Sequence, residues 1–303
     1  MVKVSIIIPT LNEEQYLPKL LESIKNQTFK DYEVIVADAG SRDRTKDMAE
    51  DFGAKVVKGG MPAAGRNSGA KAANGEFLFF FDADVKLPKD FLEKAYNEMY
   101  ERFLDIATTE CVPLSNIMID KVMHDFANFM IKTEQFSEKP YIPGSCILVT
   151  RRLFDRIGGF DESLKMAEDH EFVKRASALT SFRVLKSTKY FVSVRRLRKE
   201  GRFELAWKYF IVGLHRNFKG EIREDVINYE FANYDKKSSK SLNKKLREIE
   251  KRLNIMSRNY NQFAKEYLSK KAVNIKYKPK FEKFKKQVKT RLRELNKIFK
   301  NKK

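Results

Sequence analysis

The chain has 303 residues, 42% of them hydrophobic, so it can bury a sizeable core, which excludes a wholly disordered protein. Its formal net charge of +20 would be typical of a nucleic-acid-binding protein if it were spread along the chain. It is not spread: residues 236–303 carry 25 Lys and Arg against 5 Asp and Glu, whereas residues 1–235 carry 36 of each kind. The sequence therefore indicates an electrically balanced domain followed by a cationic tail.

The cysteines and the apolar runs bear on the cellular compartment. Cys111 and Cys146 each lie in an apolar stretch, so we expect buried free thiols rather than a disulfide or a metal site, in a reducing compartment. The first residues already read as a strand, and apolar runs such as 77–81 are far shorter than the roughly 20 residues of a membrane-spanning helix. We expect a cytoplasmic protein, with peripheral attachment to the inner face of the membrane left open.

Short apolar, β-rich runs alternate with helical patterns through the first 110 residues. The expected strands are residues 3–9, 32–38, 54–57 and 76–82, and the expected helices are residues 13–27, 42–53 and 62–75. This alternation predicts βαβ units and therefore an α/β fold with a doubly wound, mostly parallel sheet flanked by helices. Ligands collect beyond the carboxyl ends of the strands in such sheets. We therefore expect the chemistry in the residues that directly follow each strand.

The patterns are less regular in residues 105–195. The expected elements are a strand over 105–112, a helix ending near Gln135, a strand and a short helix within 144–162, a helix over 167–179, and strand-like runs at 182–185 and 190–194. The predicted organisation is thus an α/β domain over residues 1–200, followed by an amphipathic helical segment rich in aromatic residues over 201–235.

The cationic tail, residues 236–303, repeats one pattern twice. Its larger apolar residues are spaced four and three apart, with a break around Pro279, which predicts two amphipathic helices. This all-helical C-terminal extension would form a helical hairpin or a coiled coil. A heptad stripe with charged flanks favours protein–protein packing, including a homo-oligomer. An anionic membrane surface is the second option, and nucleic acid is the least favoured.

The segment FFFDADV (79–85) places two acids directly after a very apolar strand. A strand of phenylalanines would be buried within the sheet. Asp82 and Asp84 follow its last residue, so we expect them to lie at the edge of the sheet. Two carboxylates one residue apart can share a hard cation and the diphosphate that it binds. The alternative is that the two acids only begin the next helix. An Asp-X-Asp alone is a weak signal, but its place after a buried parallel strand favours a metal site.

Polar segments also follow the first two strands, PTLNEE after the first and DAGSRDRT after the second. Asp38 ends a buried strand and precedes Ala-Gly-Ser, so its carboxylate can accept hydrogen bonds from a base or a ribose without side chains in the way. Asn12 and Ser41 have the alternative role of helix caps. Arg66 lies between two glycines in GRNSG and is a candidate donor toward a base or a phosphate.

As a set, these segments resemble the family 2 glycosyltransferases of the GT-A fold. The matching segments occur in the order and spacing of the family: PTLNEEQYLPKLLESIKNQTFKDYEVIVADAGSRDRT, AAGRNSGAKAANGEFLFFFDADV, GGFDE and AEDHEF. The resemblance spans roughly residues 1–200 and is highly specific as a set. It implies a nucleotide-sugar-binding catalytic domain that uses Mg²⁺ or Mn²⁺.

The resemblance also implies which residues bind the donor. The residue matching Asp38 holds the nucleobase, helped by those matching Thr10, Glu13 and Arg66, and Asp82 lies by the ribose. Two arginines in SVRRLRKEG are similar to an SXRR segment of one bacterial and archaeal subgroup and are expected to face the diphosphate: Arg195 and Arg196.

The same resemblance assigns the metal and the base. Asp84, the second acid of the Asp-X-Asp motif, is expected to ligate the divalent ion, with Asp82 beside it. The acidic pair Glu168–Asp169 would supply the catalytic base, and Asp169 is the usual choice. The alternative role of Asp169 is to cap the N-terminus of the helix that it begins. A carboxylate base is needed because a hydroxyl acceptor loses its proton as it attacks, while negative charge grows on the departing diphosphate.

The expected function is inverting sugar transfer from a nucleotide diphosphate donor, with a UDP-sugar favoured, to a hydroxyl of a glycan or a lipid-linked acceptor. One alternative is transfer to a polyprenyl phosphate, which needs no deprotonation and would suit the aromatic segment and the basic tail. An alternative of another class is a non-catalytic nucleic-acid-binding or scaffold protein that kept the fold.

Overall fold

The computed structural model describes residues 2–137, 140 and 142–201. The strands are β1 (Val4–Thr10), β2 (Tyr32–Asp38), β3 (Lys55–Lys58), β4 (Phe77–Phe81), β5 (Val85–Lys86), β6 (Ile106–Pro113), β7 (Cys146–Thr150) and β8 (Arg183–Val192). The helices are α1 (Leu17–Lys25), α2 (Thr45–Phe52), α3 (Pro62–Ala72), α4 (Phe91–Glu101), α5 (Met118–Glu134), α6 (Arg151–Ile157), α7 (Glu168–Ser177) and α8 (Arg195–Lys199). The predicted helical segments 201–235 and 236–303 lie outside the described residues, apart from Gly201.

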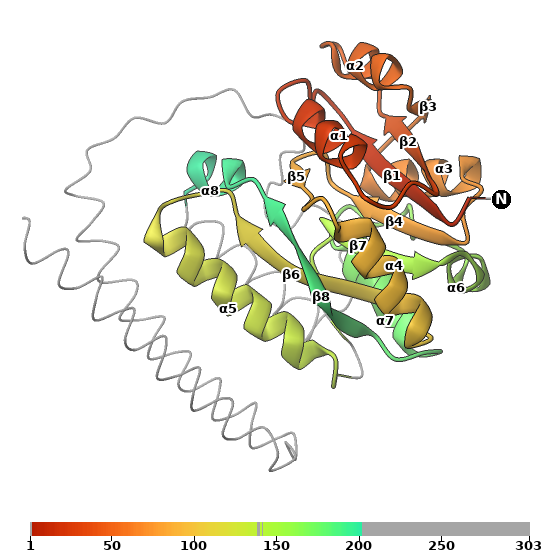
Figure 1. The fold of residues 1–303 in the computed structure, drawn as a ribbon, viewed down its shortest axis with the longest axis vertical. Helices are drawn as coiled ribbons and strands as arrows, with labels where there is room; N and C mark the ends of the chain where they lie inside the picture. Colours follow the sequence, from red (N-terminus) through yellow and green to blue (C-terminus); the bar gives the residue numbers. More distant parts are fainter. Residues whose placement is uncertain (1, 138–139, 141, 202–303) are drawn as a thin grey trace, which may run out of the picture. The chain divides into compact units, whose positions relative to one another are not determined.

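The eight strands form one mixed sheet in the order β3-β2-β1-β4-β7-β6-β8-β5 (Figure 1). The first four strands are parallel to one another, β4 and β6 are both antiparallel to β7, and β8 is parallel to β6 and antiparallel to β5. Six strands therefore run in one direction, and only β7 and β5 oppose them. This confirms the predicted α/β sheet flanked by helices, and the carboxyl ends of β1, β2 and β4 meet at one edge of it.

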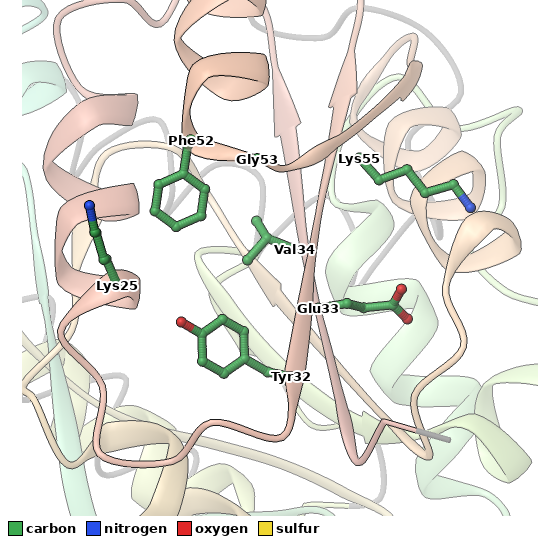
Figure 2. A pocket seen from close by; sticks show the side chains of 7 residues that line it. All are labelled: Lys25, Tyr32, Glu33, Val34, Phe52, Gly53 and Lys55. Carbon is green, nitrogen blue, oxygen red and sulfur yellow. The ribbon is translucent and has the colours of Figure 1, made fainter.

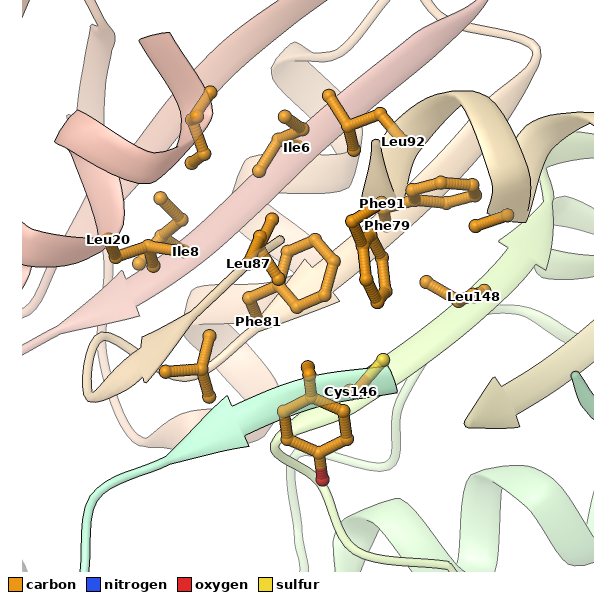
Figure 3. Close-up of a cluster of buried hydrophobic side chains, with 14 of the residues drawn as sticks. Ile6, Ile8, Leu20, Phe79, Phe81, Leu87, Phe91, Leu92, Cys146 and Leu148 are labelled. Carbon is orange, nitrogen blue, oxygen red and sulfur yellow. The ribbon is translucent and has the colours of Figure 1, made fainter. Parts of the chain in front are cut away.

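Helices cover both faces of the sheet, which explains why its central strands are continuously apolar. On one face, Phe79 and Phe81 of β4 pack in a cluster with Leu20 of α1 and Phe91 of α4 (Figure 3). On the other face, Phe80 lies in a second cluster with side chains of α3, α6 and α7. Burying each such side chain contributes about 1.5–3 kcal/mol to folding. Among the described residues, no helix is long and apolar enough to cross a membrane.

The structure corrects several expected boundaries. Neither Asn12 nor Ser41 is a helix cap, because α1 and α2 begin only after Tyr16 and Arg44. The helix predicted to end at Gly75 ends at Ala72. The two strand-like runs at 182–185 and 190–194 are joined in the single strand β8, whose register against β6 shifts at an irregularity. Both cysteines are buried and free, as predicted.

Candidate active site

The side chains expected to carry the chemistry gather where parallel strands end. Thr10 and Asp38 are the last residues of β1 and β2, and they lie side by side in the parallel register. Asp82 follows β4 directly, and its backbone N–H donates to the carbonyl of Ser145 at 3.4 Å. Because β7 runs antiparallel to β4, the residues that precede β7, Gly144 and Ser145, lie at the same edge.

The carboxylate of Asp38 is held by the loop that follows it and by Thr10 of the neighbouring strand. Its Oδ2 accepts from the Thr10 hydroxyl at 3.1 Å and from the Ser41 hydroxyl at 2.5 Å, and its Oδ1 accepts from the N–H groups of Gly40 and Ser41 at 3.0 and 2.9 Å. Gly40 has a φ of +89°, in the left-handed region that glycine adopts without strain. The carboxylate thus fixes the turn after β2, and its expected contact with the nucleobase stays a prediction.

Arg66, on α3, joins the two acidic motifs. Its Nη1 donates to Oε1 of Glu168 at 2.6 Å, and its Nη2 donates to Oδ1 of Asp82 at 3.1 Å and to the carbonyl of Gly144 at 3.2 Å. The arginine is only 3% exposed, and its guanidinium lies 5.4 Å from the ring centre of Phe160. These contacts place Arg66 between the Asp-X-Asp motif and the acidic pair. Its expected contact with the nucleobase stays a prediction.

The acidic pair opens α7, where carboxylates suit the positive end of the helix dipole. Ala167 precedes it with a φ of +60°, a conformation that is uncommon for a residue with a side chain. Glu168 is engaged by Arg66. Asp169 accepts from the backbone N–H of His170 at 2.8 Å through Oδ1, which also lies 3.5 Å from Nε2 of that histidine. Its other oxygen, Oδ2, is directed toward Gly144.

Arg195, the first residue of α8, joins the loop after β1 to the second acid of the Asp-X-Asp motif. Its two Nη atoms donate to the two carboxylate oxygens of Glu13 at 2.5 and 2.8 Å, and its Nε lies 2.9 Å from Oδ2 of Asp84. The guanidinium also lies over the ring of Tyr16, 4.4 Å from its centre. Arg196, by contrast, pairs with Glu200, the residue that directly follows α8, at 3.3 Å.

Burial and crowding of acids shape the electrostatics of this edge. Burial raises the pKa of Asp84 to about 6, against the lowering effect of Arg195, and the charges of Asp82 and Glu13 raise it further. Burial also raises the pKa of Glu13 and of Glu168, although an arginine is paired with each. Burial thus weakens the ionisation of these three acids even where an arginine lies beside them.

These residues fit a divalent cation. Asp82 and Asp84 supply hard carboxylate oxygens, and the charge of a cation beside them would oppose both the burial and the repulsion from Asp82 that raise the pKa of Asp84. Within the part of the chain that the structure describes, no group of three or more His, Cys, Asp or Glu side chains could hold a metal. The protein would therefore supply two carboxylates and leave the other positions to a phosphate-bearing ligand and water, as is usual for Mg²⁺.

Three functional features were not predicted from the sequence. Gly144 faces the site so closely that an added Cβ would lie 2.8 Å from Nη2 of Arg66 and 2.9 Å from Oδ2 of Asp169. Tyr16 supplies the ring beneath Arg195. Asn67 donates to the carbonyl of Phe160 at 2.9 Å and accepts from its N–H at 2.8 Å, which ties α3 to the GGFDE segment. Only the asparagine had a sequence signal, its place in GRNSG.

A hollow of about 470 Å³ lies away from this site, at the edge of the sheet where β2 and β3 begin (Figure 2). Its lining residues are Lys25, Tyr32, Glu33, Val34, Phe52, Gly53 and Lys55. The Tyr32 hydroxyl donates to the carbonyl of Ile24, and Lys55 donates to the carbonyl of Ala72. Tyr32 and Lys55 thus serve the fold, and no residue of the candidate active site lines the hollow.

Residues 5–158 match the family model "Glycosyl transferase family 2". The chain belongs to glycosyl transferase family 2. Among curated relatives, glycosyltransferase GlyA of Streptococcus pneumoniae is 33% identical over 35% of this chain and 16% of its own length. Poly(ribitol-phosphate) beta-N-acetylglucosaminyltransferase TarS of Staphylococcus aureus is 28% identical over 65% of this chain and 36% of its own length. This family 2 chain thus spans well under two thirds of the length of these relatives.

Solved structures agree with the family assignment. The structure of S. aureus TarS 1–349 in complex with UDP-GlcNAc has a TM-score of 0.53 and 26% identity, covering 63% of this chain and 58% of that one. A mannosyltransferase from Pyrobaculum calidifontis, in complex with GDP-Man and Mn²⁺, has a TM-score of 0.56 and 22% identity. The match covers 70% of this chain and 61% of that one. The second shows likeness of fold alone. Together they confirm that this family 2 chain has a GT-A type fold.

Proposed function

We propose that the protein transfers a sugar from a nucleotide diphosphate donor, with a UDP-sugar favoured, to a hydroxyl acceptor with inversion at the sugar carbon. The observation that carries the proposal is the position of Arg66. One buried guanidinium binds both Asp82, of the motif expected to hold the donor, and Glu168, the neighbour of the expected base. The UDP-GlcNAc complex of a similar transferase supports the choice of donor class.

The proposed reaction exchanges the bond from the sugar to the diphosphate for a bond to the acceptor oxygen. The acceptor oxygen attacks the anomeric carbon while its proton passes to a carboxylate oxygen of Asp169. The bond from that carbon to the diphosphate breaks, and its electron pair leaves with the nucleoside diphosphate. Asp169 is assigned the base role because its Oδ2 faces Gly144 at the site, while Glu168 holds Arg66 at 2.6 Å. Arg195 lies beside Asp84 and would move to the diphosphate as its charge grows.

A divalent ion, Mg²⁺ or Mn²⁺, would be held by Asp84 and Asp82, where it would supply charge stabilisation for the departing diphosphate. The remaining steps belong to the side chains of the protein. Thr10 and Ser41 hold the carboxylate of Asp38, which would fix the loop that meets the nucleoside. Arg66 would keep the donor side and the base in one fixed arrangement.

The decisive experiment is a screen of donor hydrolysis with UDP- and GDP-sugars in Mn²⁺, with UDP-GlcNAc first. We expect turnover with at least one UDP-sugar and none in the Asp84→Asn variant. If no nucleotide sugar binds the folded wild-type protein, the chain has kept the fold without the activity. Transfer to a phosphate acceptor that survives Asp169→Asn would instead favour a polyprenyl phosphate, which needs no base.

A further inference from the structure

An exposed apolar patch lies on the rim of the candidate active site, formed by Leu114, Ile117 and Met118. Their exposed fractions are 42%, 45% and 37%. They occupy the turn between β6 and α5 and the first residue of that helix. Single exposed apolar side chains are ordinary on a protein surface. Three of them within one five-residue segment, Leu114 to Met118, concentrate apolar surface at one turn.

The topology places this patch at the same sheet edge as the acids. β4 and β6 are both antiparallel to β7, so their carboxyl ends point toward the same edge of the sheet, and β6 continues past the level at which β4 ends. The N–H of Leu114 donates to the carbonyl of Val192 at 2.8 Å, and the next residue of that strand end, Ser193, donates its N–H to the carbonyl of Asp84 at 3.0 Å. Two hydrogen bonds thus connect the patch to the Asp-X-Asp motif. Figure 1 shows α8 beside the end of β6 and the start of α5.

The patch is held in a fixed shape. The Ser115 hydroxyl donates to Oδ2 of the fully buried Asp120 at 2.6 Å, and the N–H of Ile117 donates to the Ser115 oxygen at 3.1 Å. Behind it, Val194 and Leu197 pack against Met123 of α5. The apolar side chains are therefore presented by an ordered turn rather than left exposed by a loose loop.

Cations flank the patch. Lys121, one turn along α5, is exposed, and so is Arg198 on α8. α8 reads Arg-Arg-Leu-Arg-Lys, followed by one acid, Glu200. One acid, Asp125, is also exposed on α5, one turn beyond Lys121. Apolar side chains beside lysine and arginine suit the surface of an anionic bilayer, because the apolar groups enter the interface while the cations meet the headgroups.

We propose that Leu114, Ile117 and Met118, with Lys121 and Arg198, form a docking surface for an anionic lipid bilayer. The surface would turn the candidate active site toward the membrane, so that the acceptor is reached at the lipid surface. The second statement rests on the proposed function, whereas the docking surface does not. It is also distinct from the basic tail, since these residues belong to the α/β domain.

Site-specific labelling of the full chain tests the surface. Ile117→Cys, carrying an environment-sensitive dye, reports on the patch, and the native Cys111 and Cys146 are buried and would stay unlabelled. Leu179→Cys is the matched control, because Leu179 is 48% exposed and follows α7 at the opposite edge of the sheet. Both labelled proteins keep the same tail, so attraction of the tail to lipid affects them alike.

The probe is vesicles of phosphatidylcholine and phosphatidylglycerol that contain a nitroxide-labelled acyl chain. We expect a blue shift and quenching of the label at position 117 but not at 179, with smaller effects for Lys121→Glu combined with Arg198→Glu. Equal responses at both positions, or none at 117, would overturn the proposal. So would a shift at 117 that depends on protein concentration without vesicles, which would indicate self-association. Donor hydrolysis by the same labelled proteins tests the proposed function separately.

Discussion

The Nε atom of Arg195 lies 2.9 Å from Oδ2 of Asp84, so the carboxylate expected to bind a metal is bound by a cation of the protein itself. The same arginine is paired with Glu13 through both Nη atoms. A divalent ion that binds Asp84 must therefore compete with Arg195, and the arginine would then be available for the diphosphate of a donor.

Removing this competition should change the affinity for the metal alone. We expect Arg195→Ala to bind Mn²⁺ in the absence of nucleotide about tenfold more tightly than the wild type, because one adjacent positive charge is lost. Arg196→Ala is the comparison: Arg196 pairs with Glu200 and is the weaker of the two arginine influences on Asp84, so its loss should have a smaller effect. Free Mn²⁺ measured by electron paramagnetic resonance gives both affinities. Weaker binding by Arg195→Ala would show that the arginine orders the site instead of competing for it.

The raised pKa of Asp84 predicts a pH-dependent stability difference. With a folded pKa of about 6 against an ordinary 3.8, the folded protein binds this proton more tightly than the unfolded chain does. The stability that Asp84 contributes is therefore complete below about pH 4 and is lost as the pH rises through about 6. Asp84→Asn should gain up to about 3 kcal/mol relative to wild type at pH 8.

Urea denaturation of the metal-free proteins at pH 4 and pH 8 measures this difference. At pH 4 the two proteins should have nearly equal stability, because the carboxyl of Asp84 is then neutral. If the variant is the less stable protein at pH 8, the ion pair with Arg195 outweighs the cost of burying the carboxylate.

Asp169→Asn should lower kcat by about 10²-fold or more and leave the donor affinity unchanged, because it removes a general base. Glu168→Gln should not show this separation of kcat from donor affinity. Glu168 is paired with Arg66, so its loss disturbs the contacts of Arg66 rather than the proton transfer. Calorimetric donor binding and steady-state kinetics on both variants separate the two roles. Full turnover by Asp169→Asn on a hydroxyl acceptor would refute the assignment of the base.

Arg66→Ala should lower the free energy of unfolding by about 3–5 kcal/mol, because it leaves the buried carboxylate of Glu168 without its cation. Arg152→Ala is the matched control: Arg152 also pairs with an acid, Asp105, but its side chain is 82% exposed, so its loss should cost about 1 kcal/mol or less. Urea denaturation at pH 7 compares the two. Similar losses would mean that the buried bridge adds nothing to stability.

Gly144→Ala should reduce kcat and, where Arg66 shifts, also weaken donor binding through Asp82. A Cβ at this position would lie 2.9 Å from Oδ2 of Asp169 and 2.8 Å from Nη2 of Arg66, so one or both side chains must shift. A shift of the base by a fraction of an ångström is enough to impair a positioned proton transfer. Unchanged kcat on a hydroxyl acceptor would show that the site absorbs the extra carbon.

The sequence by itself determined the local elements of the parallel half of the sheet and the positions of the acids. β2 spans the predicted residues 32–38, and β4 falls within the predicted 76–82. A strand buried on both faces must be continuously apolar, so such runs are readable without knowledge of their neighbours. Because ligands collect at the carboxyl ends of parallel strands, the search could be directed to Asp38, Asp82 and Asp84.

Only the tertiary structure decided which of these side chains meet. Arg66 binds Glu168 across 102 residues, and Arg195 binds Glu13 across 182. The contact of Gly144 with the site depends on β7 running against β4, a direction that no local pattern encodes. Local periodicity reports burial, whereas the pairing of charges depends on strand order and direction, which are set by how the whole core packs.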